Sequence, residues 1–195
     1  MDNYTDAGLE LLKQKLLTMA SHAETAVNEA LQALQQRDID LAIHVKEKDR
    51  AIDQFEVEID DLVIQLLTKA PLASNLRLVT IAMKISQDLE RIGDEATKIA
   101  KRARDLSQEP PVKIVLDLPR MATLALDMLK DALDAFVNRD STAARAIIPR
   151  DKEVDAINKQ IHNANLTLSS PCHILPQIHE LANERKSFYP NRPVT

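Results

Sequence analysis

The sequence contains few of the residues from which sheets and sharp turns are built. It has two glycines, no tryptophan and only 3% aromatic residues, although 45% of its 195 residues are hydrophobic. Strands are enriched in aromatic and β-branched residues, whereas Leu, Ala, Lys and Glu favour helices. A chain of this length and hydrophobic content can bury a core. We therefore predict an all-α protein made of long helices.

Other absences limit the cellular compartment and the classes of partner that the protein could have. Cys172 is the single cysteine, so no internal disulfide can form. No apolar run approaches the roughly 20 residues of a membrane-spanning helix. The first ten residues lack the basic start and apolar core of a signal peptide. The net charge of -5 offers no basic face for nucleic acid. These features predict a cytoplasmic protein that binds neither DNA nor RNA.

Apolar residues recur at steps of three and four along three stretches of the first half of the chain. This is the spacing of a helix that packs along one seam. The expected helices are Thr5 to Gln36, a second from a cap at Asp38 or Asp40 to just before Pro71, and a third from a cap at Ser74 or Asn75 to Leu106. Three such helices predict a bundle roughly 45 Å long.

A second unit copies the first. Placing Asp151 on Asp49 gives an offset of 102, and other residues then coincide. The matched pairs are Met19 with Met121, Leu31 with Leu133, Arg37-Asp38 with Arg139-Asp140, Ala42 with Ala144, and Asp53 with Asp155. We predict tandem three-helix bundles: a first bundle at 1–108, a proline-containing linker at 109–119, a truncated second bundle at 120–165 and an irregular tail at 166–195.

The end of the chain breaks this repeat. A copy of Glu90 and Asp94 is due at positions 192 and 196, but position 192 is Arg192 and the chain ends at Thr195. Prolines at 171, 176, 190 and 193 oppose one long helix there, since each interior proline costs about 3 kcal/mol. We expect the tail to be the product of a shifted reading frame or a truncation.

The missing third helix also affects packing. Without it, the second bundle should be less stable than the first. Its seam residues should lie exposed and favour self-association as a homodimer. These residues are Ile147, Val154, Ile157 and Ile161.

Acidic residues one helical turn apart mark the candidate site. The pairs are Asp49 with Asp53, Glu90 with Asp94, and Asp151 with Asp155. Like charges at this spacing repel by roughly 0.2–0.5 kcal/mol, so something nearby should balance them. Gly93 lies within one pair and costs about 1 kcal/mol relative to alanine in a helix. A glycine there suits a place where another backbone or an ion comes close.

Four carboxylates from two neighbouring helices offer hard oxygen ligands. Such ligands suit iron, manganese, magnesium or zinc, with water or hydroxide bridging several ions. The acids could equally be a solvated helix face, because Lys98 follows Asp94 by four residues and could pair with it. Recurrence at the repeat offset favours a site. The five scattered histidines complete no zinc spacing with Cys172.

Three segments resemble the PhoU family of phosphate-uptake regulators: VKEKDRAIDQFEVEI, LASNLRLVTIAMKISQDLERIGDEATKIA and DALDAFVNRDSTAARAIIPRDKEVDAI. The resemblance covers about Asp6 to Ile161 and implies two three-helix bundles whose E/D-x-x-x-D pairs hold multinuclear iron or zinc clusters. The implied metal ligands are Asp49, Asp53, Glu90, Asp94, Asp151 and Asp155. The sequence departs from the family pattern at Asn75, at Pro149 and in the absent last acidic motif.

The resemblance also implies partners and a function. Family members act beside the phosphate ABC transporter and its sensor histidine kinase, and they repress phosphate-starvation signalling and phosphate uptake. Contact with the membrane would come only through these partners. The alternative of a di-iron enzyme needs a Glu-x-x-His motif, and no glutamate here has histidine three residues later. We therefore predict no enzyme. A metal-free helical scaffold, or an inactive truncated copy, stays open as the other alternative.

Overall fold

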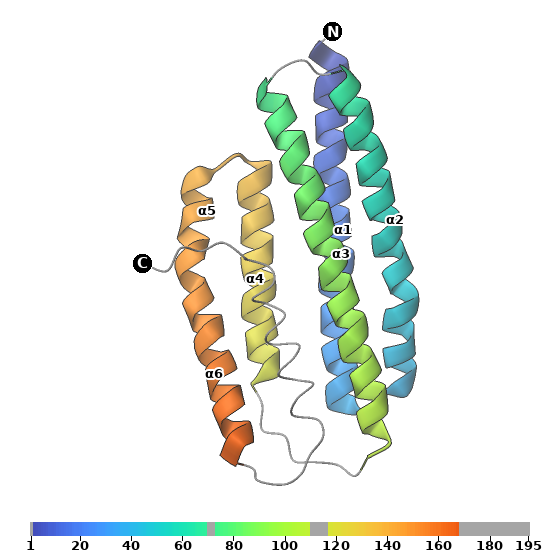
Figure 1. Ribbon diagram of the computed structural model, residues 1–195, viewed down its shortest axis with the longest axis vertical. Coiled ribbons are helices and arrows are strands. Elements are labelled where there is room, and N and C mark those ends of the chain that lie inside the picture. Colours follow the sequence, from blue (N-terminus) through green and yellow to red (C-terminus); the bar gives the residue numbers. More distant parts are fainter. Residues whose placement is uncertain (1, 70–72, 110–116, 168–195) are drawn as a thin grey trace.

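The computed structural model describes residues 2–69, 73–109 and 117–167, and every regular element in these ranges is helical (Figure 1). The elements are α1 (Asp2–Gln36), α2 (Ile39–Lys69), α3 (Ala73–Ser107), α4 (Leu118–Val137), α5 (Ser141–Ile147), the 3-10 turn η1 (Ile148–Arg150) and α6 (Asp151–Thr167). The all-α prediction is confirmed. None of the helices in the described ranges is long and apolar enough to span a bilayer.

Helices α1, α2 and α3 pack against one another along their lengths and form the first bundle (Figure 1). Leu12, Leu16 and Ile59 fill the core near the start of α1 and are fully buried. Farther along, the core is lined by alanines, among them Ala30 and Ala100. Small side chains let helix axes approach closely. The acidic motifs lie in this alanine-rich half of the bundle.

The turn between α1 and α2 recurs between α4 and α5. Arg37 and Arg139 both adopt a left-handed backbone, with φ of 58° and 55°. The following residue, Asp38 or Asp140, caps the next helix by accepting a hydrogen bond from a backbone N–H three residues later. A left-handed residue just past a helix end frees the chain to turn. The structure therefore repeats this turn at the offset of 102 that the sequence predicts.

The helical segment that follows this second turn, residues 141–167, is interrupted at one proline. Helix α5 ends at Ile147, and Pro149 lies in the 3-10 turn η1 before α6 begins at Asp151. Proline removes a backbone donor and clashes with the preceding turn of an α-helix. Pro149, one of the departures from the family pattern, therefore interrupts a helix. In the first bundle the equivalent arm is the single helix α2.

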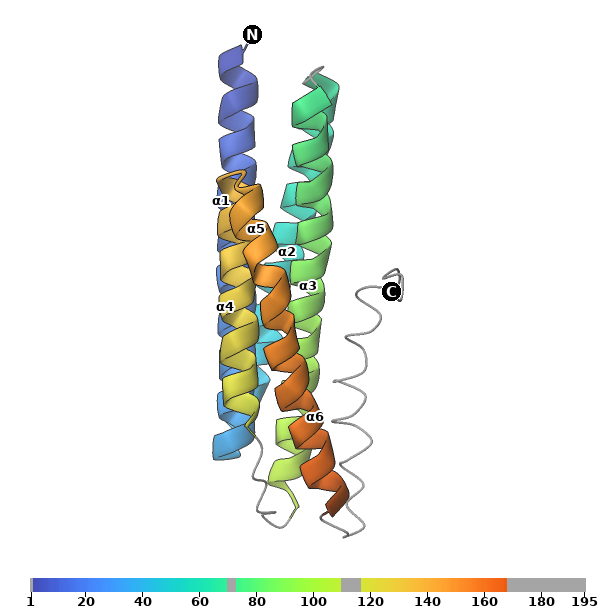
Figure 2. The same cartoon turned by 90° about the vertical axis from the view of Figure 1, so that its left-hand side faces the viewer.

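The second unit lies along one side of the first bundle and does not reach the bundle's N-terminal end (Figures 1 and 2). Helix α4 contacts α1. Leu133 joins the buried core of the first bundle, and Leu129 and Phe136 pack against it. One face of α4 thus packs against the first bundle.

Two sequence expectations need correction. Val154, Ile157 and Ile161 are only 2%, 3% and 6% exposed, and α4 is the long described helix that contacts α6; Ile147 is half-buried. Helix α3 begins at Ala73, so Ser74 and Asn75 lie within its first turn instead of capping it. The expectation about the tail falls on residues 168–195, which lie outside the described ranges.

The distribution of buried residues predicts that the first bundle is more stable than the second unit. The main core is built from α1, α2 and α3, with Leu133 as the contribution of α4. We expect backbone amides of α1–α3 to exchange with solvent at least about tenfold more slowly than those of α4–α6, since opening the second unit exposes less apolar surface. Native-state hydrogen exchange followed by mass spectrometry measures this. Equal protection in the two units would contradict it.

Candidate functional site

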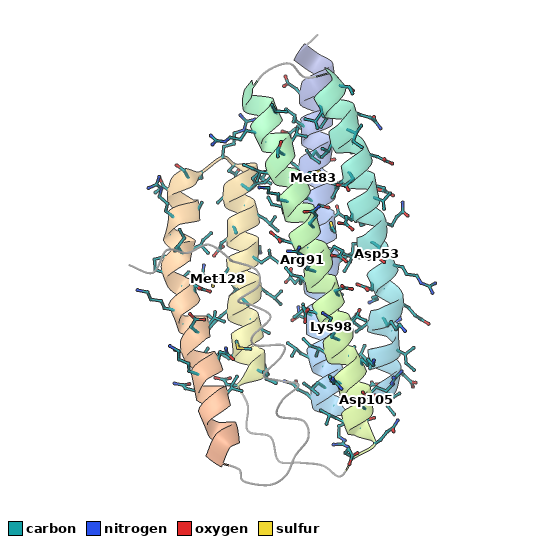
Figure 3. All side chains as sticks on the ribbon, viewed as in Figure 1. Asp53, Met83, Arg91, Lys98, Asp105 and Met128 are labelled. Atoms are coloured by element: carbon teal, nitrogen blue, oxygen red, sulfur yellow. The ribbon has the colours of Figure 1, made fainter. Side chains whose placement is uncertain are left out.

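The structure brings the two acidic pairs of the first bundle together between α2 and α3. Asp53 lies on the side of α2 that borders α3 (Figure 3). Asp49 is half-buried one turn earlier on α2, and Glu90 is half-buried on α3. The charge of Asp94 acts on both Asp49 and Glu90. The four carboxylates that the sequence singles out therefore lie near enough to act on one another, and this row of acids along the α2–α3 contact is here called the acidic groove.

Gly93 is the residue that allows the two helices to meet there. A Cβ atom at this position would lie 2.8 Å from Oδ1 of Asp49 and 2.8 Å from Cδ1 of Ile52. The carboxylate of Asp49 thus occupies space that any larger residue on α3 would fill. The sequence predicts a close approach by another backbone or an ion at Gly93, and the groups that approach in the structure are instead the side chains of Asp49, a candidate ligand, and Ile52.

Burial and like charges raise the carboxyl pKa values of this groove. For Asp49, burial is the largest cause of a raised pKa, and the charges of Asp53 and Asp94 add to it. The hydroxyl of Thr97 acts in the opposite direction on the same pKa, although no hydrogen bond of ordinary geometry satisfies its buried Oγ1. Burial, followed by the charge of Asp94, also raises the pKa of Glu90. A bound cation would relieve this repulsion.

The acidic groove extends further than sequence reasoning foresaw. Burial and the charges of Asp60 and Asp53 raise the pKa of Glu56, and Glu56 in turn acts on Glu90. Oδ1 of Asp60 is buried without a hydrogen-bond partner. The α2 acids at 49, 53, 56 and 60 follow steps of four, three and four, the period of one helix face. This spacing is the sequence signal from which Glu56 and Asp60 could have been included among the acids of the site.

An ion pair fixes α2 against α1 directly before the first acidic motif. Lys48 Nζ lies 2.5 Å from Oε1 of Glu29. The same pair recurs in the second unit, where Arg150 donates to Asp131 directly before Asp151. Both pairs are related by the repeat offset. Each holds the start of an acidic motif in register with the helix beside it.

The second acidic motif has no facing helix among the described residues. Asp151 opens α6 and is half-buried, and Asp155 is exposed one turn later. The described elements that contact α6 are α4 and η1, and the repeat equivalent of α3 would lie beyond Thr167. The structure therefore brings four of the six predicted ligands together and leaves this pair apart from them.

The chemistry of the donor set fits a hard cation. Four carboxylates from two helices supply oxygen ligands, and their raised pKa values reflect a surplus of negative charge. In the side-chain positions of the described residues, no three acidic, histidine or cysteine groups converge closely enough to hold one ion. Binding would therefore require rotation of the carboxylates, and Asp53 and Asp94 are exposed enough to turn.

Comparison with known proteins gives consistent matches. A family model described as the PhoU domain matches residues 16–103 and 118–182. The chain is 33% identical over 174 residues to the phosphate-specific transport system accessory protein PhoU homolog of Aquifex aeolicus, covering 88% of this chain and 79% of that protein. It is 35% identical over 151 residues to the Escherichia coli K12 protein of the same name, covering 77% and 63%.

Solved structures agree with this result. The crystal structure of PhoU from Pseudomonas aeruginosa superposes with a TM-score of 0.77 at 34% identity, covering 91% of this chain and 85% of that one. The crystal structure of the phosphate transport system regulatory protein PhoU from Streptococcus pneumoniae superposes with a TM-score of 0.77 at 30% identity, covering 85% of this chain and 78% of that one.

Removing the charge of Glu56 and removing the charge of Glu58, both on α2, should change the free energy of unfolding in opposite directions. The pKa of Glu56 is raised, so its charged form costs folding free energy once the pH exceeds that pKa. We expect Glu56→Gln to raise the free energy of unfolding at pH 7 by about 0.2–0.5 kcal/mol per relieved like-charge pair. The gain should vanish below about pH 4, where the carboxyl is protonated in both states. Urea unfolding of chelator-treated protein from pH 4 to 7 measures it.

Glu58→Gln is the matched control. Hydrogen bonds from Lys15 and Gln54 lower the pKa of Glu58, so its charge stabilises the fold. This variant should be less stable at pH 7, and the loss should shrink as the pH falls through the lowered pKa. Shifts of the same sign in both variants would refute the electrostatic account of the acidic groove.

Proposed function

We propose that this chain, which belongs to the PhoU family, is a cytoplasmic regulator of phosphate homeostasis that acts by contact. It is a homologue of accessory and regulatory proteins of phosphate transport. The finer proposal is that it contacts the phosphate ABC transporter and a sensor histidine kinase, self-associates as a homodimer, and represses phosphate-starvation signalling and phosphate uptake. PhoU family members are regulatory proteins and not enzymes, in agreement with the sequence prediction.

The family match is the observation that carries this proposal, and the acidic groove between α2 and α3 carries its metal-binding part. We propose that Asp49, Asp53, Glu90 and Asp94 hold iron or zinc ions, or alternatively magnesium or manganese, as a multinuclear cluster. The surplus negative charge and the close approach at Gly93 support it. Bound ions would supply positive charge shared by two helices. The residues' own contribution is to join α2 to α3 and to make the groove sensitive to metal supply.

The second unit supports a weaker metal site. Asp151 and Asp155 would contribute two carboxylates, and no described helix faces them with a second pair. We propose that the first bundle carries the functional cluster. This asymmetry also favours the second candidate function, in which the protein is a metal-free scaffold or an inactive truncated copy that still binds a partner.

Metal binding should depend on the α3 pair. We expect Glu90→Ala, Asp94→Ala protein to lose at least half of the metal content of the parent after loading and dialysis, because two of four donors are removed. Elemental analysis measures the content, and circular dichroism confirms the fold. The control is Asp88→Ala, Asp105→Ala, which removes two exposed acids from the same helix. Full metal content in the folded Glu90, Asp94 variant would show that the ligand assignment is wrong.

Loss of the protein should release phosphate-starvation genes from repression. We expect a strain that lacks the gene to express a starvation reporter in phosphate-rich medium, and an intact copy to restore repression. Complementation with Glu90→Ala, Asp94→Ala protein then separates the two candidates, since a metal-free scaffold would still repress. Normal repression in the deletion strain, with no second copy of the gene present, would contradict the regulatory proposal.

A further inference from the structure

Four large apolar side chains are exposed near the end of the first bundle where α2 ends and α3 begins. On α2, Ile64 is 61% exposed, Val57 56% and Leu67 42%, and on α3 Leu76 is 50% exposed. Val57 and Ile64 are seven residues apart and Ile64 and Leu67 are three apart, so the three share one face of α2. Single exposed apolar residues are common, whereas a group of them marks a binding surface. These four residues are here called the exposed strip.

The register of α2 against α3 brings Leu76 to the end of the exposed strip. The two helices run in opposite directions, and Asp49 of α2 lies against Gly93 of α3. Leu67 is 18 residues past Asp49, and position 75 is 18 residues before Gly93. Each step along one antiparallel helix is a step back along the other, so Leu67 lies level with Leu76 to within about one residue. The ten residues from 57 to 67 rise by about 15 Å, which is the length of the strip along α2.

The second unit leaves the exposed strip uncovered. Helices α1 and α3 are the long helices that pack along α2. The second unit, α4 to α6, lies on the side of the first bundle away from α2 (Figures 1 and 2). The contact of α4 with the first bundle is made through α1. The strip is therefore open to a partner while both units keep the arrangement that the structure shows.

The exposed strip lies in a segment with a surplus of negative charge. Residues 53–68 contain five acids and no lysine, arginine or histidine. Lys15 of α1 pairs with one of them, Glu58. Residues 76–90 of α3 add two basic and two acidic side chains and leave this balance unchanged. Asp61, which lies between Val57 and Ile64 in the sequence, is exposed. A segment that binds here must therefore offer both apolar and positively charged side chains.

We propose that the exposed strip is the docking surface for a basic amphipathic helix of a partner protein. Apolar residues of that helix, spaced by three, four and seven, would lie on the strip, and its lysines and arginines would face the acids of α2. A second copy of this chain is a poor occupant, because two strips brought together would oppose like charges. The same negative charge repels an anionic membrane surface. This inference rests on the proposed action by contact and adds the surface and the chemistry of the segment that is bound.

A designed peptide tests the surface on the full chain. The probe is a fluorescein-labelled helix of about 14 leucines and lysines, with the leucines along one face. The contact is small, so we expect a dissociation constant of about 10–100 micromolar by fluorescence anisotropy near physiological salt. A peptide of the same composition with its leucines spread around the helix should bind at least about tenfold more weakly, because it presents the same charge without an apolar face.

A lysine placed in the exposed strip should block the peptide. We expect Ile64→Lys to raise the dissociation constant at least about tenfold, because it removes an apolar contact and repels the lysines of the probe. The control is Ile148→Lys, the same change at an isoleucine of η1 that is 58% exposed. This control should bind like the parent, and circular dichroism verifies that each variant is folded.

A second pair of variants separates local charge from net charge. Asp61→Lys and Asp127→Lys change the net charge of the chain equally, and both aspartates are exposed, one on α2 and the other on α4. We expect the first variant to weaken binding about three- to tenfold and the second to bind like the parent. Equal weakening would show that the peptide follows net charge and has no site on α2.

Three other results would overturn the proposal: a probe that does not bind the parent, an Ile64→Lys protein that binds like the parent, or a parent protein that binds anionic phosphatidylglycerol vesicles in preference to the probe. The deletion strain tests the regulatory proposal separately. Released repression in that strain together with no binding of the probe would show that the surface is wrong and the function right. Normal repression together with site-specific binding would show the reverse.

Discussion

The close approach of α2 to α3 at Gly93 is the constraint on which the acidic groove depends. Helix packing forces the carboxylate of Asp49 into space that a side chain on α3 would otherwise fill. The bundle therefore keeps the acids of the two helices near one another. Because the buried apolar residues of three long helices hold the bundle closed, the repulsion persists as raised pKa values of Asp49, Glu56 and Glu90. Packing energy thus maintains a site that favours positive charge.

Periodicity in the sequence predicted the helices, the three-helix bundle and the four acids of the groove, because seam spacing fixes which face of each helix is buried. It did not identify Glu56 and Asp60, since their effect on Glu90 depends on the distance between helices, which no single helix pattern encodes. It also placed Val154, Ile157 and Ile161 in solvent. Their burial depends on how tightly α4 lies along α6, and tertiary contact decides that.

The repeat is preserved unevenly across the two units. The left-handed arginine, the aspartate cap and the ion pair before the acidic motif all recur at one offset. Each of these features involves only the two helical segments of one hairpin. Within the described residues, the feature that differs is the facing pair of acids, which α3 supplies in the first bundle. Asn158 and His162 stand at the positions equivalent to Glu56 and Asp60.

The ion pair present in both units shows that the helical hairpin is the part of the fold that the two units share. A hairpin whose turn, cap and cross-link all lie within itself keeps its shape when its surroundings change. Lys48 with Glu29, and Arg150 with Asp131, act as internal braces of this kind. The first acid of each motif is therefore positioned by two helices alone, whatever packs against the third side of the hairpin.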